Sequence, residues 1–417
     1  MLVKKEIELG GRIFSIETGR YAKQANGSVM VRYGDTMVLV TAVAANEAKE
    51  GLDYFPLQVE YREKTSAAGK FPGGYIKREG RPTEKEILSS RLCDRPIRPM
   101  FPESFKNETQ VIAMVMSYDG ENDPDVLAAC GASAALAISD IPFDGPIAEI
   151  RIGRIAGELV VNPTHEQLKL SDIELVVAGT SDSIMMVEGE SKEVSEQELL
   201  DALKFAQQEI KKIVDLQNQL RAEAGKIKWV VTEKTVDANL KKDVYDLAEA
   251  KFKEIVYSIL AKEERSAKNK ELSESVKKSL AEKYPEQEKV IGEILHDMEK
   301  DLMRERILKE GIRLDGRNTT QVRPITIELG NLPRTHGSAL FTRGETQSLT
   351  NVTLGTKDDE QTVDGLLAEY SKKFYLQYNF PPFSVGEVGR MTGVGRREIG
   401  HGNLAERSLK QVLPADE

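Results

Sequence analysis

Residues 27–36 read GSVMVRYGDT and residues 337–346 read GSALFTRGET, a shift of 310 positions. Each stretch is a short β-type run that ends in a glycine, an acidic residue and a threonine, which is typical of a strand followed by a tight turn. Two further matches follow at a shift of 319, Phe55-x-Leu57-Gln58 with Phe374-x-Leu376-Gln377 and Lys77-Arg78-Glu79 with Arg396-Arg397-Glu398. One loop insertion of nine residues explains the change of shift, so the pattern predicts an internal duplication.

The duplication divides the chain into three regions. Residues 1–228 alternate short apolar runs with glycine-bearing turns, and predict strands at 37–41 and 111–116, a buried helix at 127–138 and a helix capped at Ser195. Residues 226–291 contain no glycine and one proline, Pro285, which predicts an all-helical segment with a charged, solvated face. We therefore predict an α+β protein with a first copy at 1–228, a helical domain at 229–309 and about half of a second copy at 310–417.

Composition excludes several classes of protein. The 417 residues are 40% hydrophobic and 30% charged, which is globular composition, and the formal net charge is −10. No run of about 18 apolar residues predicts a membrane span, and the N-terminus has no signal-peptide core. Two cysteines, Cys93 and Cys130, cannot form a disulfide framework or a four-ligand zinc site, so a reducing cytoplasm is the expected location.

The most basic segment runs from Lys70 to Arg98. Glycines and Tyr75 precede its cations, and a mobile loop with an aromatic ring suits stacking on single-stranded nucleic acid, worth roughly 1–3 kcal/mol per base. Arginine binds phosphate bidentately. The alternative is a solvated helix from Glu84 to Arg91 whose charges pair with one another.

The second candidate is GEVGRMTGVGRREIGHG at 386–402. Its six glycines allow the backbone to approach a ligand, and Arg396, Arg397 and His401 can grip an oxyanion, which predicts a phosphate site. Neither a Walker loop nor a dinucleotide fingerprint is present. The alternative is a structural turn with a helix that starts at His401 or later.

The stretches GGYIKREGRPTEKEILSSRLCDRPIRPMFP, RLDGRNTTQVRPI and GVGRREIGHG resemble bacterial polynucleotide phosphorylases. The resemblance implies two RNase PH-like copies joined by an all-α segment, and a trimer that degrades RNA from its 3′ end with phosphate and magnesium. It also implies RNA-binding roles for one set of residues: Tyr75, Lys77, Arg78, Arg81, Arg91, Arg95 and Arg98. Arg396, Arg397 and His401 match residues near the phosphate and the RNA 3′ end.

The first copy lacks the chemistry that the resemblance implies for an active copy. Asn122-Asp123-Pro124-Asp125 replaces a serine-rich phosphate loop, and carboxylates there repel an anion. The active copy's Asp-x5-Asp-x-Lys group, which handles magnesium, falls on Leu168, Glu174 and Val176. Leucine and valine cannot ligate magnesium. We expect the first copy to be structural and RNA-binding.

We expect the active group, and the KH and OB-type modules of the family, to lie beyond Glu417, which would make this a truncated and catalytically incomplete chain. Two hypotheses stay open at this point. The chain belongs to a phosphate-dependent 3′-to-5′ exoribonuclease that degrades mRNA, or it is a non-catalytic RNA-binding or assembly subunit derived from one.

Overall fold

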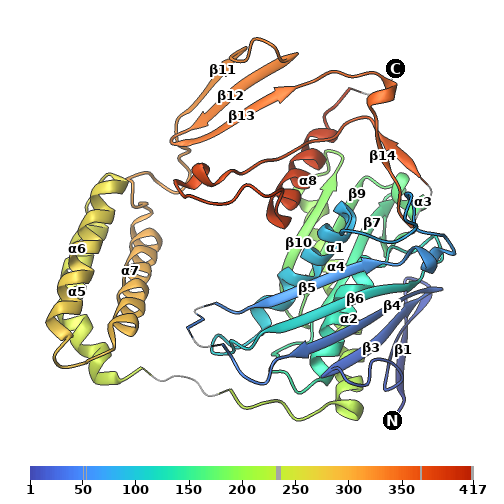
Figure 1. Cartoon of the computed structure of the whole chain (residues 1–417), viewed down its shortest axis with the longest axis horizontal. Helices are drawn as coiled ribbons and strands as arrows, with labels where there is room; N and C mark the ends of the chain where they lie inside the picture. The colour runs from blue at the N-terminus through green and yellow to red at the C-terminus, as the bar shows by residue number, and fades with distance from the viewer. Residues whose placement is uncertain (50, 53, 232–235, 367–368, 415–417) are drawn as a thin grey trace. The chain divides into compact units, whose positions relative to one another are not determined.

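The computed structural model describes residues 1–49, 51–52, 54–231, 236–366 and 369–414. Its contacts form two compact units, Met1–Thr232 with Thr356–Glu417, and Glu233–Gly355 (Figure 1). Residues 310–417 therefore contribute to both units. The domain boundaries at 228 and 309 stay predictions.

The first unit is built around a six-stranded sheet. The strands lie in the order β1 (Val3–Leu9), β2 (Arg12–Thr18), β3 (Gly27–Tyr33), β4 (Thr36–Ala44), β6 (Thr109–Ser117) and β5 (Leu57–Glu63). All neighbours are antiparallel except β5 and β6. The strands predicted at 37–41 and 111–116 are confirmed as the central pair β4 and β6, where β-branched and apolar residues are buried.

A second, antiparallel sheet has the order β10 (Ile184–Ser191), β9 (Ile173–Gly179), β7 (Ala148–Ile155) and β8 (Glu158–Val161), and the short α3 (His165–Lys169) lies between β8 and β9 in the chain. Helix α2 (Asp125–Ile138) packs against β3 and β4 of the first sheet and β7 of the second, and all of its 14 residues are buried. Helix α4 (Glu196–Ala224) follows the predicted cap at Ser195 and packs on β1, β7 and α2.

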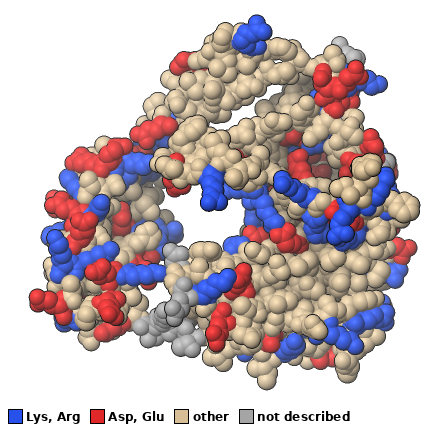
Figure 2. Space-filling view, in the orientation of Figure 1, with Lys and Arg blue, Asp and Glu red and all other residues tan. Residues whose placement is uncertain are grey.

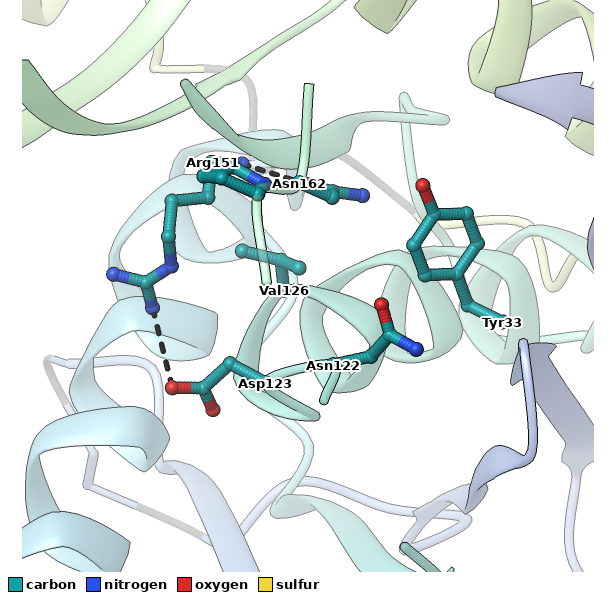
Figure 3. A pocket seen from close by; sticks show the side chains of 7 residues that line it. Tyr33, Asn122, Asp123, Val126, Arg151 and Asn162 are labelled. Carbon is teal, nitrogen blue, oxygen red and sulfur yellow. Dashed lines mark hydrogen bonds and ion pairs between the residues drawn. The ribbon is translucent and has the colours of Figure 1, made fainter. Parts of the chain in front are cut away.

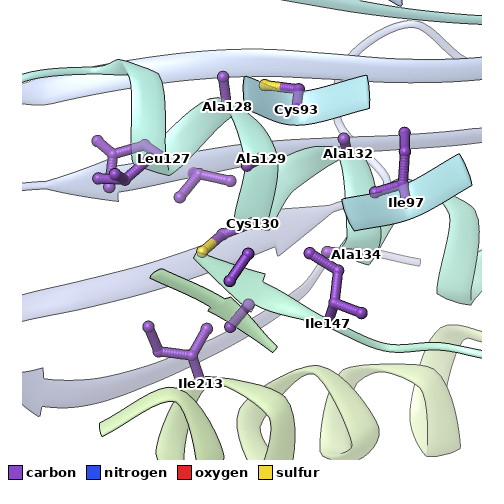
Figure 4. Close-up of a cluster of buried hydrophobic side chains, with 14 of the residues drawn as sticks. Cys93, Ile97, Leu127, Ala128, Ala129, Cys130, Ala132, Ala134, Ile147 and Ile213 are labelled. Carbon is purple, nitrogen blue, oxygen red and sulfur yellow. The ribbon is translucent and has the colours of Figure 1, made fainter. Parts of the chain in front are cut away.

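The two cysteines lie in this core (Figure 4). Cys93 comes from α1 (Glu84–Ile97) and Cys130 from α2, among small and aliphatic side chains. Burial raises the pKa of Cys130 to about 12 and raises that of Cys93 well above its usual value. Neither thiol ionises near neutral pH, so neither is a ready nucleophile.

The remaining elements of the first unit are short, apart from the last helix. They are the 3₁₀ turns η1 (Thr65–Ala68), η2 (Arg98–Met100), η3 (Lys357–Asp359) and η4 (Pro382–Val385), the hairpin β14 (Gln361–Val363) and β15 (Tyr370–Lys372), and α8 (Arg396–Lys410). Because α8 begins at Arg396, the alternative that placed a helix start at His401 or later is wrong. Helix α8 packs against α1.

The second unit begins with three helices, α5 (Ala238–Tyr257), α6 (Lys262–Leu280) and α7 (Glu288–Glu310), as the glycine-free segment predicted. They share an apolar core that includes Val244, Phe252 and Leu295. Figure 2 shows Lys and Arg interspersed with Asp and Glu over the surface of these helices. The unit also holds a three-stranded sheet, β11 (Ile325–Leu329), β12 (Gly337–Arg343) and β13 (Thr346–Val352). No helix among the described residues is long and apolar enough to cross a membrane.

The hairpin that opened the duplication is present twice. Strands β3 and β4 pair antiparallel, as do β12 and β13, and Tyr33↔Thr36 corresponds to Arg343↔Thr346 across the turn. Gly34 and Gly344 adopt left-handed φ values of 60° and 64°, a conformation that favours glycine. The predicted shift of 310 is therefore correct for this hairpin.

The shift of 319 is wrong. Helix α1 starts after its cap Thr83 and α8 starts after Gly395, so these positions correspond at a shift of 312. Each helix has a glutamate at its third position, Glu86 or Glu398, whose carboxylate accepts the N–H of the residue that precedes the helix. The same carboxylate accepts a second N–H from the strand region before the helix. Glu86 accepts it from Glu63 at 2.8 Å, and Glu398 from Phe380 at 2.7 Å. The correspondence of Glu63 with Phe380 gives a shift of 317. Lys77-Arg78-Glu79 lies in a loop, whereas Arg396-Arg397-Glu398 lies in a helix, so that match is coincidental.

Candidate nucleic-acid interface

A long loop joins η1 to α1 and carries most of the predicted RNA-binding residues. It is held at its base by Glu79, which accepts from the N–H and hydroxyl of Thr65 at 3.3 and 3.2 Å. Beyond that anchor the side chains are exposed, and the ring of Tyr75 is 102% exposed. A ring that packs against nothing in its own chain is free to stack on a base.

The three predicted cations of the loop are also exposed. Within the described ranges, Lys77, Arg78 and Arg81 form no hydrogen bond or ion pair. Lys77 has a φ of 52°, a left-handed conformation that is uncommon in residues other than glycine. The loop thus presents uncompensated positive charge next to an exposed aromatic ring, which is the pattern that binds a single strand.

The three predicted arginines of α1 and of the turn η2 that follows it have different surroundings. Arg98 donates to both oxygens of Asp94 and to the carbonyl of Leu57 at 3.1 Å, so it ties α1 to β5. Arg95 forms an ion pair with Glu188 of β10. Arg91 is half-buried, and its side chain has no hydrogen bond or ion pair among the described residues. Of the three, Arg91 is the one free to meet an anion.

The three residues predicted for phosphate lie at the start of α8 and point to different partners. Arg396 forms an ion pair with Glu60 and donates to the carbonyl of Val59 at 3.0 Å. The imidazole of His401 lies edge-on to the ring of Tyr378, with 5.4 Å between centroids. Arg397 is exposed and has no partner in the described part of the chain. The structure therefore separates Arg396 from Arg397, which sequence alone treats as a pair.

Arg91 of α1 and Arg397 of α8 come together where the two helices pack. The side chain of Arg91 packs against α8 at Gly400. A Cβ atom added to this glycine would lie 2.4 Å from the Nε atom of Arg91. Burial, together with the positive charges of Arg95 and Arg397, lowers the pKa of Arg91. Neither guanidinium group forms an ion pair among the described residues, although the charges of Glu188 and Asp94 act on Arg91. An anion bound between the two arginines would reduce their mutual repulsion.

One residue near this position, Arg407, was missed by sequence reasoning. Arg407 of α8 donates to Glu188 at 3.5 Å and to Glu190 at 3.3 Å, on the same strand that Arg95 contacts. At the corrected shift of 312, Arg407 is the counterpart of Arg95. The sequence therefore holds an arginine at this position in both copies, but the match is visible only when the two helices are aligned at the correct shift.

The corresponding position in the first copy is filled by its own charges (Figure 3). Arg151 lies 3.7 Å from Asp123, the pair that Figure 3 shows. Arg151 also lies 2.5 Å from Asp125 and pairs with Glu174, while Lys85 lies 3.4 Å from Asp123. Although burial opposes ionisation, Lys85 and Arg151 hold the pKa of Asp123 at about 2. The cavity beside them has a volume of about 10 Å³, room for one water molecule but not for phosphate.

The first copy does not fit magnesium. Leu168 lies in α3 and Val176 is buried in β9, and the carboxylate of Glu174 is neutralised by Arg151. Among the described residues, no group of three or more His, Cys, Asp and Glu side chains is placed to hold a metal ion.

Comparison with known proteins links this geometry to a family. The family model described as 3′ exoribonuclease family, domain 1, matches residues 10–142 and 321–417, and the model for domain 2 matches 145–209. The model described as polyribonucleotide nucleotidyltransferase, RNA binding domain, matches 239–318.

Curated relatives called polyribonucleotide nucleotidyltransferase match the whole chain. The protein of Chlorobaculum parvum is 53% identical over 435 residues, and that of Geobacter sulfurreducens is 54% identical over 414 residues. The chain spans 59% of the length of each of these relatives. A solved structure of rice (Oryza sativa) Rrp46 covers 50% of this chain with a TM-score of 0.41 and 15% identity.

Proposed function

The chain belongs to the polyribonucleotide nucleotidyltransferase branch of the 3′ exoribonuclease family, and from that premise we propose that it binds single-stranded RNA for 3′-to-5′ phosphorolysis. Its membership confirms the resemblance and the α+β fold class expected from the sequence. In phosphorolysis an oxygen of inorganic phosphate attacks the last phosphodiester. The bond from phosphorus to the 3′ oxygen of the preceding nucleotide breaks, and a nucleoside diphosphate leaves.

The observation that supports this proposal best is the pair Arg91 and Arg397, which come from the two copies and whose side chains form no ion pair among the described residues. Two guanidinium groups can hold a phosphate and neutralise the charge that develops on the transferred phosphoryl group. We assign this contact to Arg397 rather than Arg396, because Arg396 is already paired with Glu60.

The exposed loop supplies the second part of the proposal. Tyr75 stacks on a base, while Lys77, Arg78 and Arg81 follow the backbone of the strand. We assign Arg95 and His401 to positioning roles, since each contacts protein groups next to the arginine pair. Arg98 is a structural residue in this proposal.

We further propose that turnover requires residues that neither copy supplies here. In the first copy, Arg151 and Lys85 already neutralise the carboxylates, and residues 310–417 contain no Asp-x5-Asp-x-Lys run. Magnesium, a trimeric assembly, a role in mRNA degradation and a cytoplasmic location are assigned on family membership alone.

The second candidate is a non-catalytic RNA-binding or assembly subunit. The internally neutralised site around Arg151 favours it, because that site has lost its capacity for phosphate.

One experiment tests the proposal and separates the candidates. Fluorescence anisotropy of labelled oligo(A) measures RNA affinity of the purified chain, with and without inorganic phosphate, and release of ADP from poly(A) with phosphate and magnesium measures turnover. We expect binding that phosphate weakens through Arg397, and no release of ADP. Absence of RNA binding contradicts the proposed function, and release of ADP contradicts the inference about turnover.

A further inference from the structure

Strand β3 is preceded by a chemically unstable pair of residues. Asn26 stands directly before Gly27, and this is the one Asn-Gly pair in the 417 residues. In such a pair the backbone nitrogen of the glycine can attack the side-chain amide carbon of the asparagine, because glycine has no side chain to hinder the approach. Asparagine is for this reason among the residues that are lost at high temperature.

The fold requires the glycine of this pair. Helix α2 packs on β3 and β4, and a Cβ atom added to Gly27 would lie 1.9 Å from the carbonyl oxygen of Ala135 (Figure 1). The same atom would lie 3.0 Å from the Cβ atom of Ser139. Any other residue would collide with the backbone of the helix, so a bulkier neighbour cannot protect Asn26.

Asn26 itself is held from three directions. Its Oδ1 atom accepts the N–H of Ala44 at 3.1 Å, and its Nδ2 atom donates to the carboxylate of Asp140 at 2.9 Å. Its carbonyl oxygen accepts from the Nζ atom of Lys226 at 2.7 Å. While these bonds hold, the side-chain amide cannot turn toward the nitrogen of Gly27.

The second copy fills the equivalent position with a residue that cannot react. At the shift of 310, His336 is the counterpart of Asn26, and Leu354 is the counterpart of Ala44. The Nδ1 atom of His336 accepts the N–H of Leu354 at 2.8 Å, which repeats the bond from Ala44 to Asn26. The fold therefore needs an acceptor at this position, and it does not need an amide.

We propose that Asn26 is a deamidation site that reacts when this end of the sheet opens, and that the product hinders its closure. The nitrogen of Gly27 forms a bond to the Cγ atom of Asn26, and the bond from Cγ to Nδ2 breaks. Ammonia leaves with the proton that the nitrogen of Gly27 gives up. Water then opens the resulting succinimide ring at one of its two carbonyl groups, which gives isoaspartate or aspartate.

Both products oppose the closed arrangement. Each replaces the amide that donates to Asp140 with a carboxylate, so two negative charges face each other at hydrogen-bond distance. Isoaspartate also adds a methylene group to the backbone directly before Gly27, where the helix leaves no room. The inference rests on this packing and is independent of the proposed action on RNA.

The test incubates the whole chain in mildly alkaline buffer, folded or unfolded in urea, and follows deamidation of the Asn26 peptide by mass spectrometry. We expect slower conversion in the folded chain. Asp140→Ala should raise the folded rate about fivefold, as expected for the loss of one hydrogen bond, and leave the rate in urea unchanged. Asp144→Ala is the matched control, because Asp144 is exposed in the same loop, and it should behave as wild type.

Equal folded rates for Asp140→Ala and wild type overturn the proposal, as does a wild-type rate that is the same with and without urea. The effect of the product is tested separately. Asn26→Asp should unfold at a lower denaturant concentration than wild type, and addition of Asp140→Asn, which exchanges donor and acceptor, should restore the midpoint. Asn26→His keeps an acceptor without an amide, so it should keep its thermal stability during the incubation while wild type loses it. An Asn26→Asp chain as stable as wild type contradicts the proposed effect on closure.

Discussion

Arg95 and Arg407 hold the same carboxylate, Glu188, from two helices that occupy equivalent positions in the two copies. Glu188 belongs to β10, so one acidic residue joins both copies to the second sheet. The negative charge of Glu188 also acts on Arg91 and raises its pKa, against the effects of burial and of the neighbouring arginines.

Glu188→Gln should weaken folding and strengthen RNA binding. Its loss leaves Arg95 without its ionised acceptor and Arg407 with Glu190 alone, at a cost of about 1–3 kcal/mol in the free energy of unfolding. Removal of a negative charge beside Arg91 should raise affinity for oligo(A). Thermal denaturation and anisotropy measure the two effects. Glu190→Gln is the matched control, since its one ion pair among the described residues is with Arg407, and an equal gain in affinity there contradicts the prediction.

Gly400→Ala should weaken the binding of RNA and phosphate and leave the stability of the folded chain nearly unchanged. Alanine is about 1 kcal/mol more favourable than glycine inside a helix, but its Cβ atom displaces the guanidinium of Arg91. We expect stability within about 1 kcal/mol of wild type, and weaker binding of RNA and phosphate. Gly402→Ala is the control, because its nearest neighbour is the Cβ atom of Tyr378 at 3.2 Å. Unchanged affinity in Gly400→Ala removes Arg91 from the anion site.

Substitution of the loop cations should reduce the salt dependence of RNA binding. Each lost phosphate contact lowers the slope of log affinity against log salt by about 0.7 for a single strand. Alanine at Lys77, Arg78 and Arg81 together should therefore flatten the slope by about two units with no change in thermal stability, since these side chains are exposed. An unchanged slope shows that the loop does not contact the phosphates.

Tyr75→Ala should cost about 1–3 kcal/mol of RNA binding without a change in the salt slope, because stacking involves no released counterion. Ile76→Ala is the matched control, since Ile76 is exposed in the same loop but has no ring. Equal losses in both variants indicate that loop conformation, and not stacking, supports binding.

Acid should destabilise the first copy in a defined range. The pKa of Asp123 is about 2 in the folded chain, against an ordinary value of 3.8. A depressed carboxylate pKa gives stability that is fully present above about pH 5, and that is lost as the pH falls toward 2. Denaturant midpoints measured between about pH 5 and pH 2 should fall more steeply for wild type than for Asp123→Asn. Parallel curves rule out this ion-pair network as the source.

Local patterns in the sequence predicted many of the elements correctly. Apolar and β-branched runs gave β4 and β6, the Ala-rich run gave α2, and the Ser195 capping box gave the start of α4. These signals are local, because periodicity and capping depend on neighbours within a few residues. They do not depend on how distant segments pack.

The shift of 319 predicted for the second copy was wrong because similar residues occur at positions that are not equivalent in the two copies. From Gly69 to Thr83 is 14 positions, but from Gly386 to Gly395 is only 9, so the second copy has a shorter loop before its helix. Basic residues occur in the first-copy loop and at the start of α8, and matching them gave the wrong shift. The bonds of Glu86 and Glu398 to the preceding strand region fix the true correspondence, and they are visible only in three dimensions.

The different partners of Arg396 and Arg397 could not be predicted from the sequence either. Adjacent residues on a helix point about 100° apart, so they cannot share one ligand unless it lies between them. Which of the two was free depended on Glu60, 336 positions away in the chain.

Helix α2 has a consequence for how the chain is made. All of its 14 residues are buried, so it has no polar side of its own, and the strand β7 and helix α4 that cover it come later in the sequence. A ribosome releases the N-terminal end first, so α2 can pack on the earlier strands β3 and β4 before β7 and α4 have emerged. A pause in translation between residues 138 and 224 therefore leaves the apolar side of α2 that β7 and α4 cover exposed to water.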